Sequence, residues 1–509
     1  MRGRKRTWAD APGNMLMRRI RLIVIVVLSA GLVLGLAAQS PERARQLKQA
    51  RELVAAGKTD EAIAIYAALV KQSPADPSLR VNLAISQFKA GHYAETIAHC
   101  RKALEQRPGM IPALLFLGAA YAKLGRPAEA VEPLRKVVVA RPKERNARLM
   151  LAESLLRVGK FEEAAEHFRA ASSMLPRSPR VWYGLERCYT VLAEAEFERL
   201  ARLAPGSAYI EALLGDARME QEQYEAAFAR YRRALALDAG LTGVHTALAE
   251  IYERTGHPDW AAVERKREPA APADCRSSDL ACLFAHEQFL DLLRANGAAF
   301  WKKRAYDRLA EQAFAKLAAL PDSAELHELK ARRLDSAGSY TAAVNEWTKA
   351  LALSPGNAVL NQGLATALFH ARDYEAALPL LEKLLEQKPD SAEFLFLYGD
   401  ALLSLKRPRD ATGYLESSVE RDPTNLFAHA ELGRAYLELG DGARAIPHLL
   451  TALPADEDGT RHFELARAYR MTGDTKRAKE TLTEYSRLRK EAAERERERE
   501  RRRRVVAPE

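Results

Sequence analysis

Apolar positions along the chain recur with the period of an α-helix, and residues 111–144 show the pattern most clearly. Two helices are predicted there, each with apolar residues three or four positions apart on one face. Gly125 can end the first helix in the left-handed conformation, Pro127 favours the first turn of the second helix, and Pro142 stops it. The apolar faces consist of Leu114, Leu117, Tyr121, Ala130, Leu134 and Val137. One such hairpin cannot bury its apolar face alone, so neighbouring hairpins must cover it.

The same hairpin returns at a step of 34 residues. A small residue recurs near the start of the second helix, at Ala62, Thr96, Ala130 and Ala164. The closing proline recurs at Pro74, Pro108, Pro142 and Pro176. This pattern resembles the tetratricopeptide repeat family, in particular bacterial multi-repeat members that are exported or membrane-anchored. The resemblance covers most of residues 43–490 and implies an all-α fold, a right-handed superhelical solenoid of about twelve helix–turn–helix repeats in two arms.

Breaks in the repeat pattern predict five segments. The fifth repeat lacks its glycine-containing turn, and its closing Pro205 arrives five residues early. Two prolines and several small residues at 268–277 indicate a linker. An alternating Glu/Arg stretch near the end has lost its apolar face, so we expect a solvated, fraying helical tail there. The segments are 1–40, a signal peptide or single membrane anchor; 41–267, an N-terminal arm of about seven repeats; 268–322, a linker with a cysteine pair and a degenerate hairpin; 323–490, a C-terminal arm of five repeats; and 491–509, the charged tail.

Residues 22–38 form an uncharged apolar run that follows Arg18, Arg19 and Arg21. A cleaved export signal and an uncleaved membrane anchor with its basic end in the cytoplasm are both open. Either would place the repeats outside the cytoplasm, in the periplasm or attached to the inner membrane. The start of translation is open among Met1, Met15 and Met17.

The formal net charge of +10 is located at the two ends of the chain. Residues 1–21 carry seven basic side chains against one acidic, and residues 485–509 carry ten against six. These two segments account for the whole excess, so the repeats between them have no net charge and offer no stripe for nucleic-acid phosphates. The cluster Arg501–Arg504 leaves contact with acidic lipid or nucleic acid open, with a solvated end favoured.

Cys275 and Cys282 lie in the linker, and His286 follows them. In an exported protein a disulfide between the two cysteines is the favoured interpretation, and closing so short a loop would contribute roughly 2–3 kcal/mol. Free thiols and a metal site of two thiolates and one imidazole are the alternatives, although a fourth ligand and a usual ligand spacing are lacking. Cys100 and Cys188 are expected to be small packing residues.

The sequence contains no phosphate-binding glycine loop, no nucleophile elbow and no complete HExxH motif, since Leu290 stands where the second histidine after His286 would be. We therefore predict a protein that is not an enzyme, with no cofactor and no small-molecule substrate. An enzyme or metal site within residues 268–322 is kept as the alternative, and cytoplasmic nucleic-acid binding through the basic tail as a second one.

The family resemblance implies that the first helix of each repeat lines a concave groove, chiefly through its second, fifth, ninth and twelfth positions. Charged side chains of both signs occupy the ninth position, acidic among them Asp216, Glu250 and Asp400. The candidate groove residues are Tyr183, Arg187, Tyr209, Arg332, Phe396, Phe427, Arg434, Phe463 and Arg467. Charged groups beside aromatic rings suit a peptide or a partner helix, so the predicted function is a scaffold for an envelope or secretion-related assembly. Pairing of these charges with one another across neighbouring repeats is the open alternative.

Overall fold

The computed structural model describes residues 41–269, 274–276, 278–296, 299–503 and 505–508, and in these residues all regular structure is helical. The chain divides into two compact units, one up to Leu175 and one from Pro176 onward. The all-α solenoid predicted from the repeats is confirmed, because the helices form successive antiparallel pairs. No helix within the described residues is both long and apolar enough to cross a bilayer, and the apolar run at 22–38 lies outside them.

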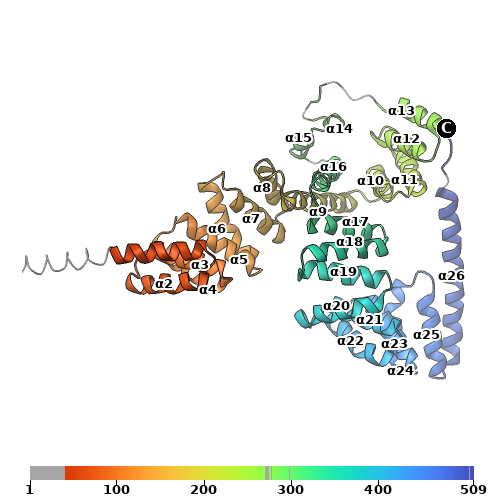
Figure 1. Ribbon diagram of the computed structural model, residues 1–509. Coiled ribbons are helices and arrows are strands. Elements are labelled where there is room, and N and C mark those ends of the chain that lie inside the picture. Colours follow the sequence, from red (N-terminus) through yellow and green to blue (C-terminus); the bar gives the residue numbers. More distant parts are fainter. Residues whose placement is uncertain (1–40, 270–273, 277, 297–298, 504, 509) are drawn as a thin grey trace, which may run out of the picture. The chain divides into compact units, whose positions relative to one another are not determined.

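Unit 1 is a regular stack of helical hairpins (Figure 1). Each glycine predicted to end a first helix has a positive φ, as at Gly125 with 69°, so a side chain at these positions would be strained. Ala130 and Leu134 are fully buried between paired helices. After helical residues 41–55, the helices are α2 (Thr59–Gln72), α3 (Pro77–Lys89), α4 (Tyr93–Gln106), α5 (Ile111–Lys123), α6 (Pro127–Ala140), α7 (Arg145–Arg157) and α8 (Phe161–Met174).

Unit 2 contains a second stack, whose first hairpin pairs two helices that are far apart in sequence. The 25-residue α9 (Pro179–Leu203) packs along α16 (Ala299–Ala318), and Tyr189 stacks on Tyr306 with ring centroids 6.1 Å apart. The stack continues in sequence order through α17 (Ala324–Ser336), α18 (Tyr340–Leu353), α19 (Ala358–His370), α20 (Tyr374–Gln387), α21 (Ala392–Ser404), α22 (Pro408–Arg421), α23 (Leu426–Glu438), α24 (Gly442–Ala452), the short η1 (Leu453–Ala455), α25 (Thr460–Met471) and α26 (Thr475–Arg503).

The helices between α9 and α16 form a branch beside this stack, which we call the branch helices (Figure 1). They are α10 (Ala208–Glu220), α11 (Tyr224–Leu237), α12 (Val244–Arg254), α13 (Pro258–Arg267), α14 (Leu280–Ala285) and α15 (Phe289–Leu293). This differs from the expectation that residues 41–267 form one continuous arm. Because the fifth repeat has no helix breaker at its turn, α9 runs on as one helix, and its apolar face is covered by α16 instead of by the next element in sequence.

At the end of the chain, residues 493–497 are helical and exposed, in line with the solvated helical tail expected at 491–509, but the last described residues differ from that expectation. Helix α26 continues to Arg503, and the residues after it return to the branch helices, near the C label in Figure 1. Tyr252 Oη donates a hydrogen bond of 2.7 Å to the Val506 carbonyl oxygen, and Val505 packs against the core of α10–α12. Val505 supplies the apolar surface for this contact, whereas Val506 contributes its backbone carbonyl and its side chain is exposed. The side chains of Arg501–Arg504 lie outside the described residues.

The first helices of consecutive hairpins lie closer together than the second helices. In unit 2, α17 contacts α19, α19 contacts α21, α21 contacts α23, and α23 contacts α25. Comparable contacts among α18, α20, α22 and α24 are absent from the described residues. A stack whose first helices are closer together curves toward them, so these helices form its inner face.

Candidate functional site

Two aromatic side chains stand exposed on first helices at the end of the stack in unit 2. Phe427 on α23 is 63% exposed and Phe463 on α25 is 49% exposed, and Arg467 is exposed one turn further along α25. Asn425 caps α23 by accepting hydrogen bonds of 3.1 Å from the backbone N–H groups of Phe427 and Ala428. The first turn that presents Phe427 is therefore fixed by the cap.

The same two helices and α21 carry a partly buried ionic ladder, formed by Asp400, Glu431, Arg434, Arg461 and Glu464. Arg434 pairs with Asp400 on the preceding first helix at 3.0 Å and with Glu431 on its own helix at 2.5 Å. Arg461 on α25 pairs with Glu431 at 3.3 Å and with Glu464 at 3.1 Å. Arg434 therefore pairs with a charge on a neighbouring repeat, as the alternative interpretation of the groove charges predicted. For Arg467 the structure gives no such pair within the described residues.

Burial governs the protonation of the ladder. It raises the pKa of Glu431 to about 7, with repulsion from Asp400 adding to the effect and Arg434 and Arg461 opposing it. Burial likewise raises the pKa values of Asp400 and Glu464. Three carboxylates share two guanidinium groups, so the ladder is short of one positive charge when all its members are ionised. The ion pairs of the ladder link α21, α23 and α25 and so support these three helices against one another.

The remaining predicted groove residues lie elsewhere in unit 2. Tyr183 donates a 2.7 Å hydrogen bond to Glu328, which also accepts from Arg332 at 2.8 Å, and burial raises the pKa of Tyr183. Arg332 additionally lies over the Trp347 ring, 5.4 Å from its centroid. The other three side chains are Arg187 and Phe396, both half-buried, and Tyr209, which packs on Phe300 with ring centroids 4.8 Å apart. The nine predicted residues thus do not form one continuous surface.

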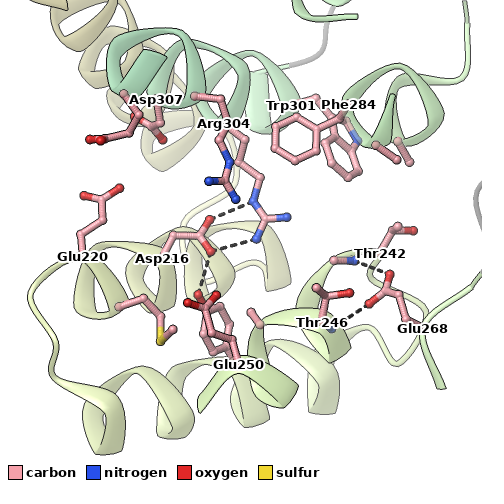
Figure 2. Close-up of a pocket in the computed structure, with 18 of the residues that line it drawn as sticks. Asp216, Glu220, Thr242, Thr246, Glu250, Glu268, Phe284, Trp301, Arg304 and Asp307 are labelled. Atoms are coloured by element: carbon pink, nitrogen blue, oxygen red, sulfur yellow. Dashed lines mark hydrogen bonds and ion pairs between the residues drawn. The ribbon is translucent and has the colours of Figure 1, made fainter. Parts of the chain in front are cut away.

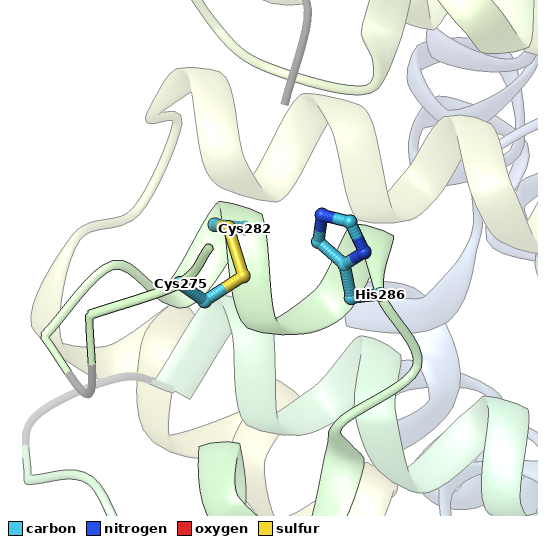
Figure 3. Close-up of side chains that lie close together, drawn as sticks. All are labelled: Cys275, Cys282 and His286. Carbon is cyan, nitrogen blue, oxygen red and sulfur yellow. A yellow bond between two sulfur atoms is a disulfide. The ribbon is translucent and has the colours of Figure 1, made fainter. Parts of the chain in front are cut away.

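Cys275 and Cys282 form a disulfide in the structure, with their Cα atoms 5.5 Å apart, and His286 lies beside it (Figure 3). The ligand atoms of all three residues lie within 4.8 Å of one another. In the disulfide the two sulfur atoms are bonded to each other, so they are not the thiolates that a metal ion would require. Cys100 and Cys188 are buried, as expected for packing residues, and burial raises the pKa of Cys100 to about 12.

Where α10 and α12 face α14 and α16, there is a cavity of about 950 Å³, which we call the branch pocket. Its lining includes eight carboxylate side chains and three guanidinium groups, together with the aromatic rings of Phe284 and Trp301 (Figure 2). Sequence reasoning missed this site because its walls come from helices that are not adjacent in the repeat order. The available signal was weak: Asp216 and Glu250 are acidic at the ninth repeat position.

A buried ion pair connects the two walls of the branch pocket. Arg304 on α16 donates from Nε at 2.8 Å and from Nη2 at 2.9 Å to the two carboxylate oxygens of Asp216 on α10. Tyr231 on α11 donates a third hydrogen bond of 2.8 Å to the same carboxylate. Glu268 accepts from the backbone N–H groups of Gly243 and Thr246, at 2.6 and 3.0 Å, and so satisfies the N-terminus of α12.

Two further carboxylates face each other across the pocket, Glu220 from α10 and Asp307 from α16 (Figure 2). Burial raises the pKa of Asp307 to about 6, and Lys303, whose Nζ lies 2.6 Å from the carboxylate, opposes that rise. Burial also raises the pKa of Glu220. Lys303 opposes the rise in the pKa of Glu220 as well, so one ammonium group already stabilises the charged forms of both carboxylates.

Comparison with protein families gives four matching models. Three are described as tetratricopeptide repeat and match residues 47–111 and 363–426, residues 87–154 and 402–463, and residues 145–188. The fourth is described as TPR repeat and matches residues 215–256. Together the matches cover more than half of the chain and reach into both units. No curated protein matches the sequence.

Solved structures of several repeat proteins resemble parts of the chain. A tetratricopeptide repeat protein from Parabacteroides merdae is 12% identical, with 64% of this chain and 98% of that chain covered and a TM-score of 0.32. MamA from Desulfovibrio magneticus RS-1 is 22% identical, with 35% and 96% covered and a TM-score of 0.28. YrrB, described as a TPR protein with an unusual peptide-binding site, is 20% identical, with 36% and 98% covered and a TM-score of 0.30.

Proposed function

The chain belongs to the tetratricopeptide repeat family, and from that premise we propose that it is a scaffold that binds a protein partner and does not catalyse a reaction. Repeats of this family stack into curved surfaces, and such surfaces serve to hold other chains. The proposed binding surface is the inner face of α23 and α25, with Phe427, Phe463 and Arg467 as its contact residues.

The exposure of Phe427 and Phe463 is the observation that carries this proposal. A large aromatic side chain left in water forgoes the free energy of burial, and exposed aromatic rings near an arginine are typical of the residues that contribute most to protein binding. Both rings project from helices that the ionic ladder joins, so the surface does not have to be ordered when the partner arrives. Such preorganisation lowers the entropic cost of binding.

The partner is proposed to present a short segment with apolar side chains for the two rings and an acidic group for Arg467. Arg467 is exposed and forms no ion pair within the described residues, so its charge is available. Arg434 is a different case, because its guanidinium already pairs with Asp400 and Glu431. It acts as a supporting residue in this proposal.

The location of the scaffold is proposed to be outside the cytoplasm, in an envelope or secretion-related assembly. The apolar run at 22–38 behind three arginines supports this, as does the disulfide between Cys275 and Cys282, since disulfides persist in oxidising compartments. Cell fractionation with N-terminal sequencing tests the proposal directly. Recovery of the chain in the cytoplasmic fraction with both thiols reduced would contradict it.

Photo-crosslinking tests the binding surface in the full-length chain. A benzoylphenylalanine residue placed at Phe427 is compared with the same residue at Tyr414, which is exposed on the second helix α22. We expect a crosslinked protein partner from the first position that is absent from the second. Identical crosslinks from both positions would contradict binding through the inner face.

The identified partner is then purified and its affinity is measured by calorimetry. Phe427→Ser is expected to weaken binding by at least about thirtyfold, which corresponds to the 2 kcal/mol or more of a central aromatic contact. Leu353→Ser is the matched control, because Leu353 is comparably exposed but lies at the end of the second helix α18. Equal affinities of the two variants would refute the assigned surface even if a partner exists.

A further inference from the structure

We propose that the branch pocket binds an organic cation, the guanidinium or ammonium group of a basic side chain that a protein partner inserts between α10, α12 and α16. The inference rests on the proposed function, because a protein partner is its source of the cation. It concerns a second surface of unit 2, formed by the branch helices and not by the inner face of α23 and α25.

The pocket holds more negative charge than its own cations neutralise. Asp216 is paired with Arg304, and Glu311 is paired with Arg333 at 2.9 Å. Glu220 and Glu222, by contrast, are exposed and accept no hydrogen bond within the described part of the chain, although Lys303 attracts Glu220 electrostatically. Glu250 forms an ion pair with Arg254 at 3.6 Å, but both side chains are exposed and the pair is therefore weak. Carboxylates gathered around a concave site attract a cation and hold it by charge-assisted hydrogen bonds.

The aromatic walls of the pocket favour an organic cation. Trp301 packs against Phe284 with ring centroids 5.4 Å apart, and both line the cavity. The guanidinium of Arg304 already lies 4.9 Å from the Phe300 centroid and 5.9 Å from that of Trp301, so these rings stand beside one cation in the structure. A second basic side chain in the pocket would contact both aromatic rings and carboxylates. The rings would stabilise its aliphatic stem and its cation, and the carboxylates would stabilise its positive charge.

The size of the pocket and the spread of its carboxylates argue against a bare metal ion as the ligand. A cavity of about 950 Å³ is in the range that accommodates side chains or small organic molecules. The acidic groups come from α10, α12 and α16, and within the described residues they do not gather three ligand atoms at metal-binding distances. Glu220 and Asp307 face each other across the pocket (Figure 2). Lys303 already donates to Asp307 Oδ2 at 2.6 Å, so Glu220 and the Oδ1 atom of Asp307 are the oxygens placed to accept from different N–H groups of one extended cation.

The same chemistry is available from two sources, a basic side chain of a polypeptide and a free polyamine. Fluorescence anisotropy of the full-length protein distinguishes them. The probe is a fluorescein-labelled seven-residue peptide of glycines with two arginines, and its control carries citrulline, which is neutral and nearly the same shape, at both positions. Spermidine is added as a competitor in a separate titration.

We expect the arginine peptide to bind at least about tenfold more tightly than the citrulline peptide, and more weakly as salt rises. Glu220→Gln combined with Glu250→Gln should weaken binding of the arginine peptide at least about tenfold, because each substitution removes a charge-assisted acceptor. The matched control is Glu386→Gln combined with Glu420→Gln, which removes two exposed carboxylates outside the pocket and should leave the affinity unchanged.

A second variant covers the case in which the double substitution disturbs folding. Thr246→Arg places a guanidinium at the exposed rim of the pocket within the chain itself, and it should abolish peptide binding while helical content stays at the wild-type level. Equal binding of the arginine and citrulline peptides would overturn the inference, and so would equal losses in the pocket and control variants. Tighter binding of spermidine than of the peptide would overturn the polypeptide source.

Failure of this inference is distinguishable from failure of the proposed function. Phe427→Ser should leave arginine-peptide binding intact, and the pocket variants should leave the crosslink at position 427 intact. If the peptide does not bind but that crosslink persists, the scaffold remains and the pocket ligand is refuted. If the peptide binds and no partner crosslinks, the scaffold proposal fails and the cation chemistry of the pocket remains.

Discussion

The ion pair between Arg304 and Asp216 should hold the branch helices against the main stack of unit 2. Arg304 is only 8% exposed and makes two hydrogen bonds of 2.8 and 2.9 Å to Asp216. Arg304→Met keeps most of the side-chain volume but leaves the carboxylate without its cation. Asp216 then keeps the hydrogen bond from Tyr231 but has lost both hydrogen bonds from Arg304.

Removing one partner of a buried pair costs about 3–5 kcal/mol, because the other charge stays in a poorly solvated site. Asp216 retains 20% of its side-chain exposure, so the lower end of that range applies, and we expect a loss of about 3 kcal/mol. Asp216→Asn should cost at least as much, because it leaves the guanidinium of Arg304, the more deeply buried partner, without its carboxylate. The double variant should be less destabilised than the sum of the two single ones.

Hydrogen exchange measured by mass spectrometry is the appropriate assay, because a repeat array does not unfold in one transition. A loss of about 3 kcal/mol corresponds to roughly 100-fold faster exchange of amides in α10 and α16. Arg294→Met is the matched control, since Arg294 is 79% exposed in its 2.8 Å pair with Asp291 and should change exchange less than about fivefold. If Arg304→Met has as small an effect as this control, the reasoning about the branch is refuted.

Three further perturbations have defined outcomes. Gly363→Ala would place a Cβ atom 2.5 Å from the indole ring of Trp347, so it should lower the free energy of unfolding in urea by about 1–3 kcal/mol. The control Gly413→Ala lies at an open helical position and should raise that free energy by up to about 1 kcal/mol. Equal effects of the two substitutions would contradict the close contact between Gly363 and Trp347. Burial raises the pKa of Glu431 from 4.5 to about 7, so wild-type stability falls as pH rises through that window, and Glu431→Gln should melt above the wild type at pH ~8 but not at pH ~5. Replacing Cys275 and Cys282 by serine should lower the stability of the loop between them by about 2–3 kcal/mol, which is measured as faster amide exchange there. Unchanged exchange would show that the disulfide does not stabilise the loop.

Helix boundaries were determined by the sequence alone, because they depend on residues within one turn of each other. Gly125 and Pro142 end helices where their backbone preferences require it, and the step of 34 residues repeats that information along the chain. The disulfide pairing was also within reach, since few residues separate the two cysteines. Local spacing likewise indicated that Phe427 and Phe463 would lie on first helices.

The tertiary structure alone decided which helix packs against which. Helix α9 lacks a turn signal, but nothing in its own residues specifies α16 as its partner, since any apolar helix face could cover it. The branch pocket follows from that pairing. The partners of charged side chains were also decided by the tertiary structure. Arg434 and Arg467 occupy equivalent repeat positions, yet only Arg434 has an acidic partner, Asp400, within reach on the preceding first helix. Repeat position predicts a side chain's direction, whereas its partners depend on long-range packing, which a local pattern does not encode.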